Sequence, residues 1–235
     1  MSIEPAPDGA DLALEFVRFC YRRRHVAWPA LFGPARDIGT VAGYTGTHLV
    51  GVFGLIGAVW GMLAGTRLVR GEEEAGRWEL LLAGQTTRRR AAAGAVAGLG
   101  IGLITLWAVT AAVTAAVGRS ADARFSVSAS LFAAVAAVAP AAMFLAVGAL
   151  CSQLAATRRQ AAGLAAGVFG IAYLLRLVAW SGTSVRWLRW TSPLGWVDEM
   201  RPLTGSRPLL LVPIVGTVAA LSAATIAVAG RRDLG

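Results

Sequence analysis

RLVRGEEEAGRWELLLAGQTTRRR, residues 67–90, is the most strongly polar stretch of the chain, and it lies between two long apolar runs. Read as a helix, it begins at Gly71, carries three glutamates where the helix dipole favours negative charge, and ends near Gly84. Its apolar side chains then lie on one side and its charged side chains on the other. We therefore expect an amphipathic helix over residues 71–84 that lies along a membrane surface or docks on a partner; a solvated loop helix is the alternative.

The rest of the sequence is rich in apolar residues. They make up 56% of the 235 residues and come in runs of about twenty or more, as membrane-spanning helices require. We therefore expect an all-α polytopic membrane protein. The formal net charge is +9, but the arginines stand between the apolar runs, where they set membrane topology. The charge argues for a membrane and against a nucleic acid as the partner.

The residue types that are missing exclude several kinds of chemistry. All 22 basic residues are arginine. Without lysine there is no GxxxxGK[ST] phosphate-binding loop, so any ATP hydrolysis must occur in another chain. The two cysteines, Cys20 and Cys151, and the two histidines, His25 and His48, are not spaced as a disulfide or a metal site. We expect no catalytic residue, metal or cofactor in this chain.

The apolar runs predict five membrane spans of sufficient length. They cover residues 41–65, 91–117, 130–150, 161–180 and 209–229. A kink is expected at Pro140 in the third span. Arg176 lies near the outer end of the fourth span, where we expect its side chain to snorkel toward the headgroups.

Arginines on both sides of the polar stretch place residues 67–90 on the cytoplasmic face, and Arg231 and Arg232 place the C-terminus there as well. Residues 1–40 are expected to form an amphipathic interfacial helix followed by an irregular linker. Five spans would put the N-terminus outside, against the arginines of that helix. Either one assignment is wrong or a sixth span is missing.

Residues 181–208 are rich in tryptophan and contain helix breakers. Trp187, Trp190 and Trp196 are typical of the headgroup layer, and Asp198 and Glu199 follow them. We expect one or two short interfacial or re-entrant helices on the outer face, before the last span.

Several glycines have the GxxxG spacing that permits close packing of helices. The pairs include Gly61/Gly65, Gly94/Gly98, Gly98/Gly102 and Gly163/Gly167. Chance supplies some of these pairs in a chain with 28 glycines. The spacing alone does not identify which pairs pack.

The sequence resembles a family of transporters in four places. These are the segment GEEEAGRWELLLAGQTTRRR, FGPARDIGTVAG at residues 32–43, WLRWTSPLGWVDEMRPLTGSRP at residues 187–208, and the terminal RRDLG. Together they resemble the permeases of ATP-binding-cassette exporters (type 2 membrane subunits), in the actinobacterial polyketide-antibiotic and multidrug branch. The resemblance is to the first half of a permease that usually has two halves in tandem.

The resemblance implies a fold, partners and a function. Residues 41–235 would form a permease domain in the cell membrane, with a cytoplasmic coupling helix and outer re-entrant helices. A separate cassette ATPase, which binds ATP and Mg²⁺, would drive export of hydrophobic small molecules such as antibiotics. A second permease half, or a second copy of the chain, would complete the pathway. The residues that would couple to the ATPase are Glu72, Glu73, Glu74, Arg77, Trp78, Glu79 and Leu82.

Two alternatives to transport remain open. The chain has half the usual length of such permeases, so it could be a non-transporting partner or regulator of another exporter. Glu72, Glu73 and Arg77 also match the EExxxR motif of CAAX-type intramembrane proteases. That chemistry needs histidines after the motif, and both histidines of this chain precede it. A protease is therefore the weaker alternative.

Overall fold

The computed structural model describes residues 33–34, 36–37, 39–67, 87–120, 123–181 and 185–231, and their regular structure is entirely helical. Five helical segments are long and apolar enough to cross a membrane: Val41–Thr66, Arg89–Gly118, Val127–Leu154, Arg158–Trp180 and Pro208–Gly230. The prediction of an all-α protein with several apolar spans is confirmed.

The first span is built from three pieces in a row. They are the α-helix α2 (Val41–His48), the π-helix η1 (Leu49–Phe53) and the α-helix α3 (Gly54–Thr66). Thr40 caps the start, because its hydroxyl accepts a hydrogen bond from the backbone N–H of Gly43 at 3.0 Å. A π-helix inserts extra residues into a turn, so η1 interrupts the regular helical repeat within the span.

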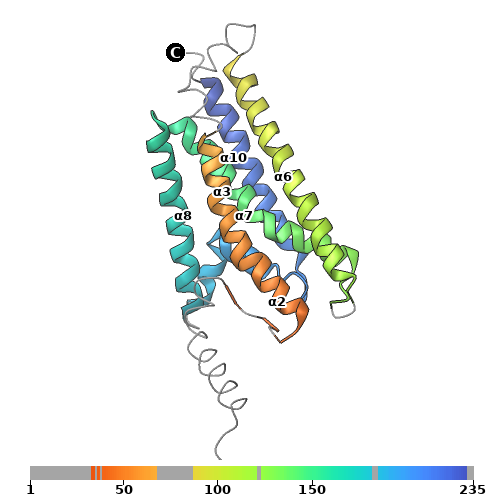
Figure 1. Ribbon diagram of the computed structural model, residues 1–235. Coiled ribbons are helices and arrows are strands. Elements are labelled where there is room, and N and C mark those ends of the chain that lie inside the picture. Colours follow the sequence, from red (N-terminus) through yellow and green to blue (C-terminus); the bar gives the residue numbers. More distant parts are fainter. Residues whose placement is uncertain are drawn as a thin grey trace, which may run out of the picture.

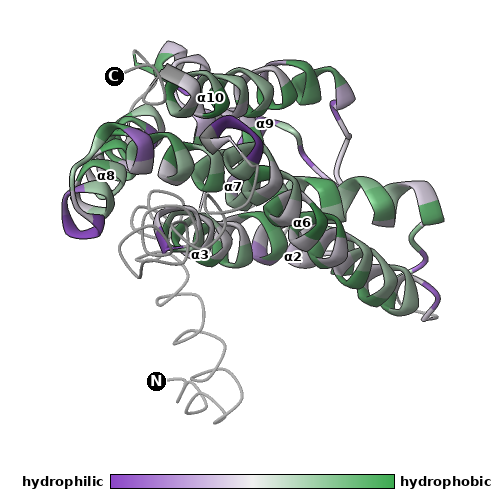
Figure 2. Cartoon of the chain, turned by 90° about the horizontal axis from the view of Figure 1, so that it is seen from above, coloured by the Kyte–Doolittle hydropathy of each residue, from purple (hydrophilic) through white to green (hydrophobic). Residues whose placement is uncertain are grey.

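Four long helices complete the bundle. They are α6 (Arg88–Gly118), α7 (Val127–Leu154), α8 (Arg158–Ser181) and α10 (Leu211–Arg231). Successive helices run in alternating directions, and α7 lies among the others in the view along the bundle (Figures 1 and 2). α7 contacts α3, α6, α8 and α10 and is the most buried of the five spans. Apolar residues dominate the sides of the helices, as a lipid-facing surface requires (Figure 2).

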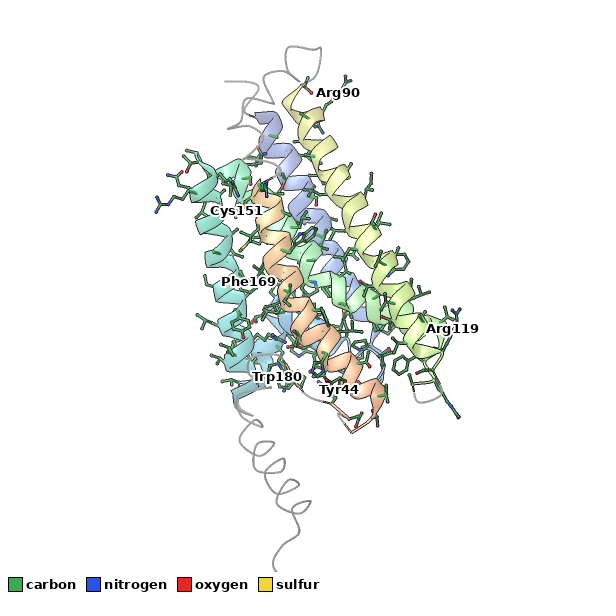
Figure 3. The ribbon with its side chains drawn as sticks, viewed as in Figure 1. Tyr44, Arg90, Arg119, Cys151, Phe169 and Trp180 are labelled. Atoms are coloured by element: carbon green, nitrogen blue, oxygen red, sulfur yellow. The ribbon has the colours of Figure 1, made fainter. Side chains whose placement is uncertain are left out.

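Three short elements join α8 to α10. They are η3 (Arg186–Trp190), α9 (Pro193–Glu199) and η4 (Pro208–Leu210). Proline suits the first turn of α9, where its missing N–H has no intrahelical partner anyway. These elements lie at the same end of the bundle as the start of α2 and the end of α6 (Figure 1), which we call the α9 end. Arg119 and Trp180 lie at this end and Arg90 at the opposite one (Figure 3).

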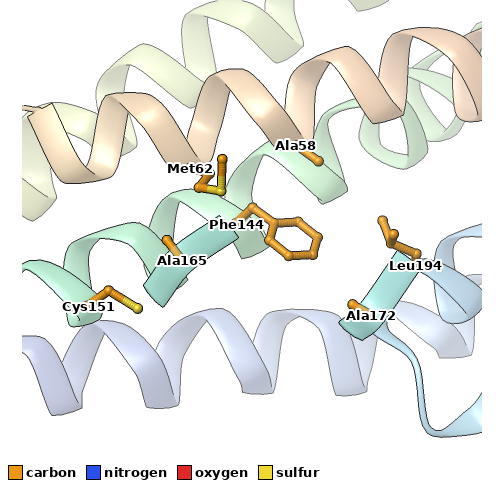
Figure 4. Packing of buried hydrophobic residues seen from close by; sticks show 7 residues of the cluster. All are labelled: Ala58, Met62, Phe144, Cys151, Ala165, Ala172 and Leu194. Atoms are coloured by element: carbon orange, nitrogen blue, oxygen red, sulfur yellow. The ribbon is translucent and has the colours of Figure 1, made fainter. Parts of the chain in front are cut away.

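Side chains from four helices meet in one core cluster, which Figure 4 shows from close by. Its largest member is Phe144 of α7, 1% exposed, whose ring meets that of Phe169 edge-on at 5.1 Å. A second cluster joins α9 to α7 through Val197 and Met143. The short α9 is therefore part of the packed bundle.

Two predicted segments lie outside the described residues. These are the interfacial helix near the N-terminus and the amphipathic helix over residues 71–84. Both stay predictions. The kink at Pro140 also stays a prediction, although the proline lies within α7 as expected.

Candidate functional site

A large apolar groove lies between the first span, α6 and α7. Its volume is about 910 Å³. Phe53 and Trp60 line it from the first span, Leu106 and Val109 line it from α6, and Ala137 lines it from α7. A space of this size falls within the range of about 300–1,000 Å³ that holds drug-sized ligands.

The groove contains hydroxyl groups, but they already have hydrogen-bond partners. Thr105, Thr110 and Thr114 donate to the carbonyl oxygens of residues 101, 106 and 110 in their own helix, at 3.0, 2.8 and 2.8 Å. Because these hydroxyl protons are already donated within the helix, the groove offers a ligand few directed hydrogen bonds. The groove favours an apolar molecule without requiring a particular pattern of donors and acceptors.

Glycines allow α3 and α7 to pack at backbone distance beside this groove. A Cβ atom on Gly61 would meet the carbonyl oxygen of Ala141, and one on Gly65 would likewise meet an α7 carbonyl oxygen. In the other direction, a Cβ atom on Gly148 would lie 2.5 Å from the carbonyl oxygen of Met62. The predicted pair Gly61/Gly65 is therefore a real packing motif.

The other predicted glycine pairs behave differently. No side chain or neighbouring backbone lies within 4 Å of where a Cβ atom would stand on Gly94, Gly98, Gly102, Gly163 or Gly167 in the described part of the chain. These glycines lie on α6 and α8. The same spacing thus marks a tight interface on α3 and open surface on the other two helices.

A buried ion pair joins α8 to α9. The Nε of Arg176 donates to Oδ2 of Asp198 at 2.7 Å, and its Nη2 donates to Oδ1 at 2.8 Å. The indole N–H of Trp180 also donates to Oδ2, at 3.2 Å. Arg176 is 2% exposed and Asp198 is 6% exposed. The prediction that Arg176 snorkels toward the headgroups is wrong, because a carboxylate within the bundle meets both of these guanidinium nitrogens.

Four arginines surround the neighbouring carboxylate, whose side chain is only 5% exposed. One terminal nitrogen of each donates to Glu199: Arg36 at 3.2 Å, Arg189 at 2.8 Å, Arg201 at 3.0 Å and Arg207 at 3.2 Å. We call these five residues the Glu199 cluster. It ties the segment before α2, η3 and the loop between α9 and η4 to the end of α9.

The cluster changes the proton affinity of its members. Burial by itself would raise the pKa of the Glu199 carboxyl, but the hydrogen bond from Arg189 and the charges of Arg36 and Arg201 outweigh it and lower the pKa. Burial also lowers the pKa of Arg36, against the opposing attraction of Glu199. Glu199 is thus held in its charged form, as the common acceptor of the cluster.

The backbone around the cluster is in unusual conformations. Gly33 has φ +89°, and a Cβ atom on it would lie 2.6 Å from Nη2 of Arg176 and 2.7 Å from Oδ1 of Asp198. Glycine therefore fits here for both its conformation and its lack of a side chain. Arg201 and Leu203 adopt φ values of +49° and +66°, which cost energy in residues with a side chain.

The tryptophans of residues 181–208 divide into two groups. Trp187 and Trp190 are 63% and 56% exposed. Trp196 is partly buried, and its indole N–H donates to the carbonyl oxygen of Trp190 at 2.7 Å. Two of the three therefore present their rings to the surroundings, while the third fastens α9 to η3.

A small cavity adjoins the Glu199 cluster. Its volume is about 30 Å³, and its walls include Arg36, Arg201, Thr47, Val50 and Gly51. Val50 and Gly51 belong to the π-helix η1. A cavity of this size and polarity has room for a water molecule.

The structure brings together one of the two predicted sets of site residues. Asp198 and Glu199 meet in the Arg–carboxylate network described above, whereas the seven expected ATPase-coupling residues lie outside the described residues. No group of three or more metal-binding side chains occurs in the described ranges. Sequence reasoning missed the four arginines around Glu199, which are up to 163 residues apart from it. For Arg189, Arg201 and Arg207 the available signal was the density of arginine in residues 181–208, whereas Arg36 lies outside that segment.

Comparison with known proteins adds the family. Residues 31–232 match the family described as "Multidrug efflux system permease Rv1217c, C-terminal domain". The chain is also 30% identical over 211 residues to the multidrug efflux system permease protein Rv1217c of Mycobacterium tuberculosis (strain ATCC 25618 / H37Rv). The aligned region covers 88% of this chain and 36% of that protein.

The chain thus spans about a third of the length of this curated relative. The matched part is a C-terminal domain, rather than the first half that the resemblance implied. The match includes the apolar groove, the Glu199 cluster and all five apolar helices. The chain belongs to the family of ABC-type multidrug efflux permeases that is represented by the C-terminal domain of Rv1217c.

Proposed function

We propose that this chain is the membrane-spanning permease part of an exporter that a separate ATPase drives, and that it exports hydrophobic small molecules such as antibiotics or drugs. The observation that carries the proposal is the apolar groove between the first span, α6 and α7, with its volume of about 910 Å³. It has the size and lining for a lipophilic ligand.

The chemistry of the groove supports a broad choice of substrate. Aromatic and aliphatic side chains supply most of its wall, and the three threonine hydroxyls are bonded to their own helix. Binding would then depend on apolar area and shape more than on directed hydrogen bonds. The five spans also contain no aspartate or glutamate. This supports ATP rather than a proton gradient as the energy source.

The partners follow from the same proposal. Residues 72–82 would dock on a cassette ATPase, which would bind ATP and Mg²⁺, and a second permease half or a second copy would complete the pathway. Exposed arginines at the end opposite α9, including Arg89, Arg90 and Arg159, support a cytoplasmic position for that end in the cell membrane, and hence for the C-terminus.

Transport across liposomes tests the role of the groove. The permease, its second half and the ATPase would be reconstituted, and ATP-dependent movement of a hydrophobic fluorescent dye measured. Val109→Trp fills the groove from α6 and should lower the transport rate at least about tenfold, because a ligand and the indole cannot share the space. Leu174→Trp is the matched control, since Val109 and Leu174 are 57% and 59% exposed and Leu174 is on α8, away from the groove. Equal rates for the two variants would reject the groove as the substrate site.

Association with the ATPase tests the coupling segment. Replacing Glu72, Glu73 and Glu74 by arginine should abolish capture of the ATPase while membrane insertion stays normal, because like charges replace the proposed acidic contacts. Unchanged capture would contradict the assignment. If the chain binds the ATPase and a second permease but never supports ATP-stimulated flux, the alternative function is favoured, in which the chain is a non-transporting partner of another exporter.

A further inference from the structure

We propose that the α9 end binds an anionic phospholipid, with the lipid phosphate on the Glu199 cluster and one acyl chain in a groove between α8 and α10. This site is distinct from the apolar groove between the first span, α6 and α7, and it does not depend on the proposed transport function. Charge, free hydrogen-bonding capacity, an adjacent apolar groove and exposed tryptophans support it.

The first observation is an excess of positive charge. Within the described residues, the Glu199 cluster and the Arg176–Asp198 pair bring five arginines to two carboxylates, which leaves three positive charges. The side chains of Arg36, Arg189 and Arg201 are 24%, 15% and 27% exposed. Partly buried charges that lack a counter-ion are costly. An anion bound at the cluster would offset that cost.

The second observation is spare hydrogen-bonding capacity. A guanidinium carries five N–H donors, and the bonds to Glu199 occupy one terminal nitrogen of each of four arginines. The Nε atoms of Arg36, Arg189 and Arg201 are buried without a partner. Arg207, whose side chain is 47% exposed, is the most accessible member of the cluster. Its guanidinium could take a phosphate in a two-pronged arrangement that suits this pair of groups.

The third observation identifies the anion as part of a lipid. A groove of about 200 Å³ runs between α8 and α10, over Met143 and Phe144 of α7, and is lined by the apolar side chains of Val168 and Ile171. Its volume is below the range of about 300–1,000 Å³ for drug-sized ligands, so it takes a narrow apolar segment such as part of one hydrocarbon chain. Ile171 is 63% exposed, so the groove is open along its side.

The groove and the cluster are connected through the backbone. Thr191 and Pro193 line one end of the groove, and they join η3, which carries Arg189, to α9, which carries Glu199. Among the described tryptophans, Trp187 and Trp190 are the most exposed, and they stand on either side of Arg189 in the sequence. Tryptophan favours the depth of lipid headgroups. A lipid in one leaflet would therefore place its phosphate at the cluster, at the α9 end, and its acyl chain in the groove between α8 and α10.

Binding measurements on the purified full chain in detergent test the proposal. Native mass spectrometry and thermal unfolding would be recorded with dioleoyl-phosphatidylglycerol, with dioleoyl-phosphatidylcholine, and with glycerol 3-phosphate, which has the phosphate ester without acyl chains. We expect phosphatidylglycerol to bind and to raise the melting temperature. We expect phosphatidylcholine to bind at least about tenfold more weakly, because its headgroup adds a positive charge to a cationic site. Glycerol 3-phosphate should have no effect at the same concentration.

Two pairs of variants locate the site. Arg207→Gln should weaken phosphatidylglycerol binding about tenfold, as expected for losing a hydrogen bond between charged groups. Arg119→Gln removes the same charge from an exposed position at the same end and should leave binding unchanged. Ile171→Trp should fill the chain groove and weaken binding, whereas Leu174→Trp, on the same helix but outside the groove, should not.

Several results would overturn the proposal. Equal binding of the two phospholipids would show that the excess positive charge of the cluster does not select an anionic headgroup. Full stabilisation by glycerol 3-phosphate would show a site for a free phosphate ester without an acyl chain. Unchanged phosphatidylglycerol binding in both Arg207→Gln and Ile171→Trp would place the lipid elsewhere. None of these results tests the apolar groove between the first span, α6 and α7, because Val109 and the other residues that line it do not contribute to the lipid site.

Discussion

The glycines of α3 and those of α6 have the same spacing but opposite surroundings. Toward α7, the glycines of α3 bring two backbones into direct contact, and at the α9 end ion pairs fasten α8 and η3 to α9. Toward α6, the helices enclose a groove, and the glycines Gly94, Gly98 and Gly102 of α6 itself have open space beside them. We call the α3–α7 interface together with the ion pairs of the α9 end the packed side, and the groove with its α6 wall the open side. The comparison shows that glycine provides close packing only where a second helix supplies a complementary surface.

Physical chemistry explains why the packed side needs such contacts. In lipid there is no hydrophobic force between helices, so they associate through van der Waals packing and hydrogen bonds. Ser152 of α7 donates to the Gly148 carbonyl at 2.8 Å and lies within 3.5 Å of the Gly65 carbonyl of α3. α6 lacks a comparable glycine contact with α3 in the described part of the chain. The open side can therefore admit a ligand without breaking a tight interface.

The largest expected effect comes from removing the common acceptor on the packed side. Glu199→Gln should lower the free energy of unfolding by about 3 kcal/mol, at the lower end of the range of about 3–5 kcal/mol for breaking a buried ion pair, because the arginine partners are partly exposed. Unfolding in sodium dodecyl sulfate would measure it. Asp37→Asn, at an exposed residue near the same end, is the control. A loss no greater than that of the control would contradict the structural role of the cluster.

A pair of glycine substitutions compares the two sides directly. Gly61→Ala should destabilise the protein by about 1–3 kcal/mol, because the new methyl group meets the backbone of α7, which cannot move aside as a flexible side chain would. Gly98→Ala, on α6, should be neutral or stabilising by up to about 1 kcal/mol, since alanine favours the helix. The same unfolding assay applies to both. Equal effects would remove the distinction between the packed side and the open side.

Acidification should weaken the packed side only at low pH. The pKa of Glu199 is lower in the folded protein than its ordinary value. Its contribution to stability is therefore present above the unfolded pKa of about 4.3 and is lost as the pH falls through the folded pKa. We expect this contribution to be constant from pH 8 to 5 and to decline below that. The difference in free energy of unfolding between wild type and Glu199→Gln, measured across this pH range, isolates this contribution. If that difference disappeared already at pH 6, the pKa of Glu199 would be raised in the folded protein and the prediction would be wrong.

The smallest effect on stability is expected on the open side. Val109→Ala should change the free energy of unfolding by no more than about 0.5 kcal/mol, because the side chain is 57% exposed. Binding of a hydrophobic dye, followed by fluorescence, should nevertheless weaken as the groove loses apolar surface. A large loss of stability without a change in dye binding would show that α6 is part of the rigid scaffold.

The spans of this protein were predictable because hydrophobicity is local. Runs such as residues 130–150 and 209–229 require no knowledge of the fold, and helices occur at both. Pro193 at the start of α9 and the capping Thr40 also act through neighbouring residues, although neither role was predicted from the sequence. Each depends on chemistry within a few positions of the chain.

The packing and the ion pairs could not be predicted in the same way. Gly61/Gly65 and Gly94/Gly98 have identical spacing, and only the position of a second helix distinguishes them. Arg36 reaches Glu199 across 163 positions of sequence. Arg176 shows the same limit, since an arginine near the end of a span predicts snorkelling unless the carboxylate that meets it is known.

The π-helix η1 has a consequence for anyone who wishes to change this protein. Four of its five residues separate two spaces: Leu49 and Phe53 line the large groove, while Val50 and Gly51 line the small cavity beside the arginines. A substitution that repositions this turn therefore alters two compartments together. Substitutions that reshape the large groove through this turn would also disturb the polar cavity behind it, whereas changes made from the α6 wall would leave that cavity intact.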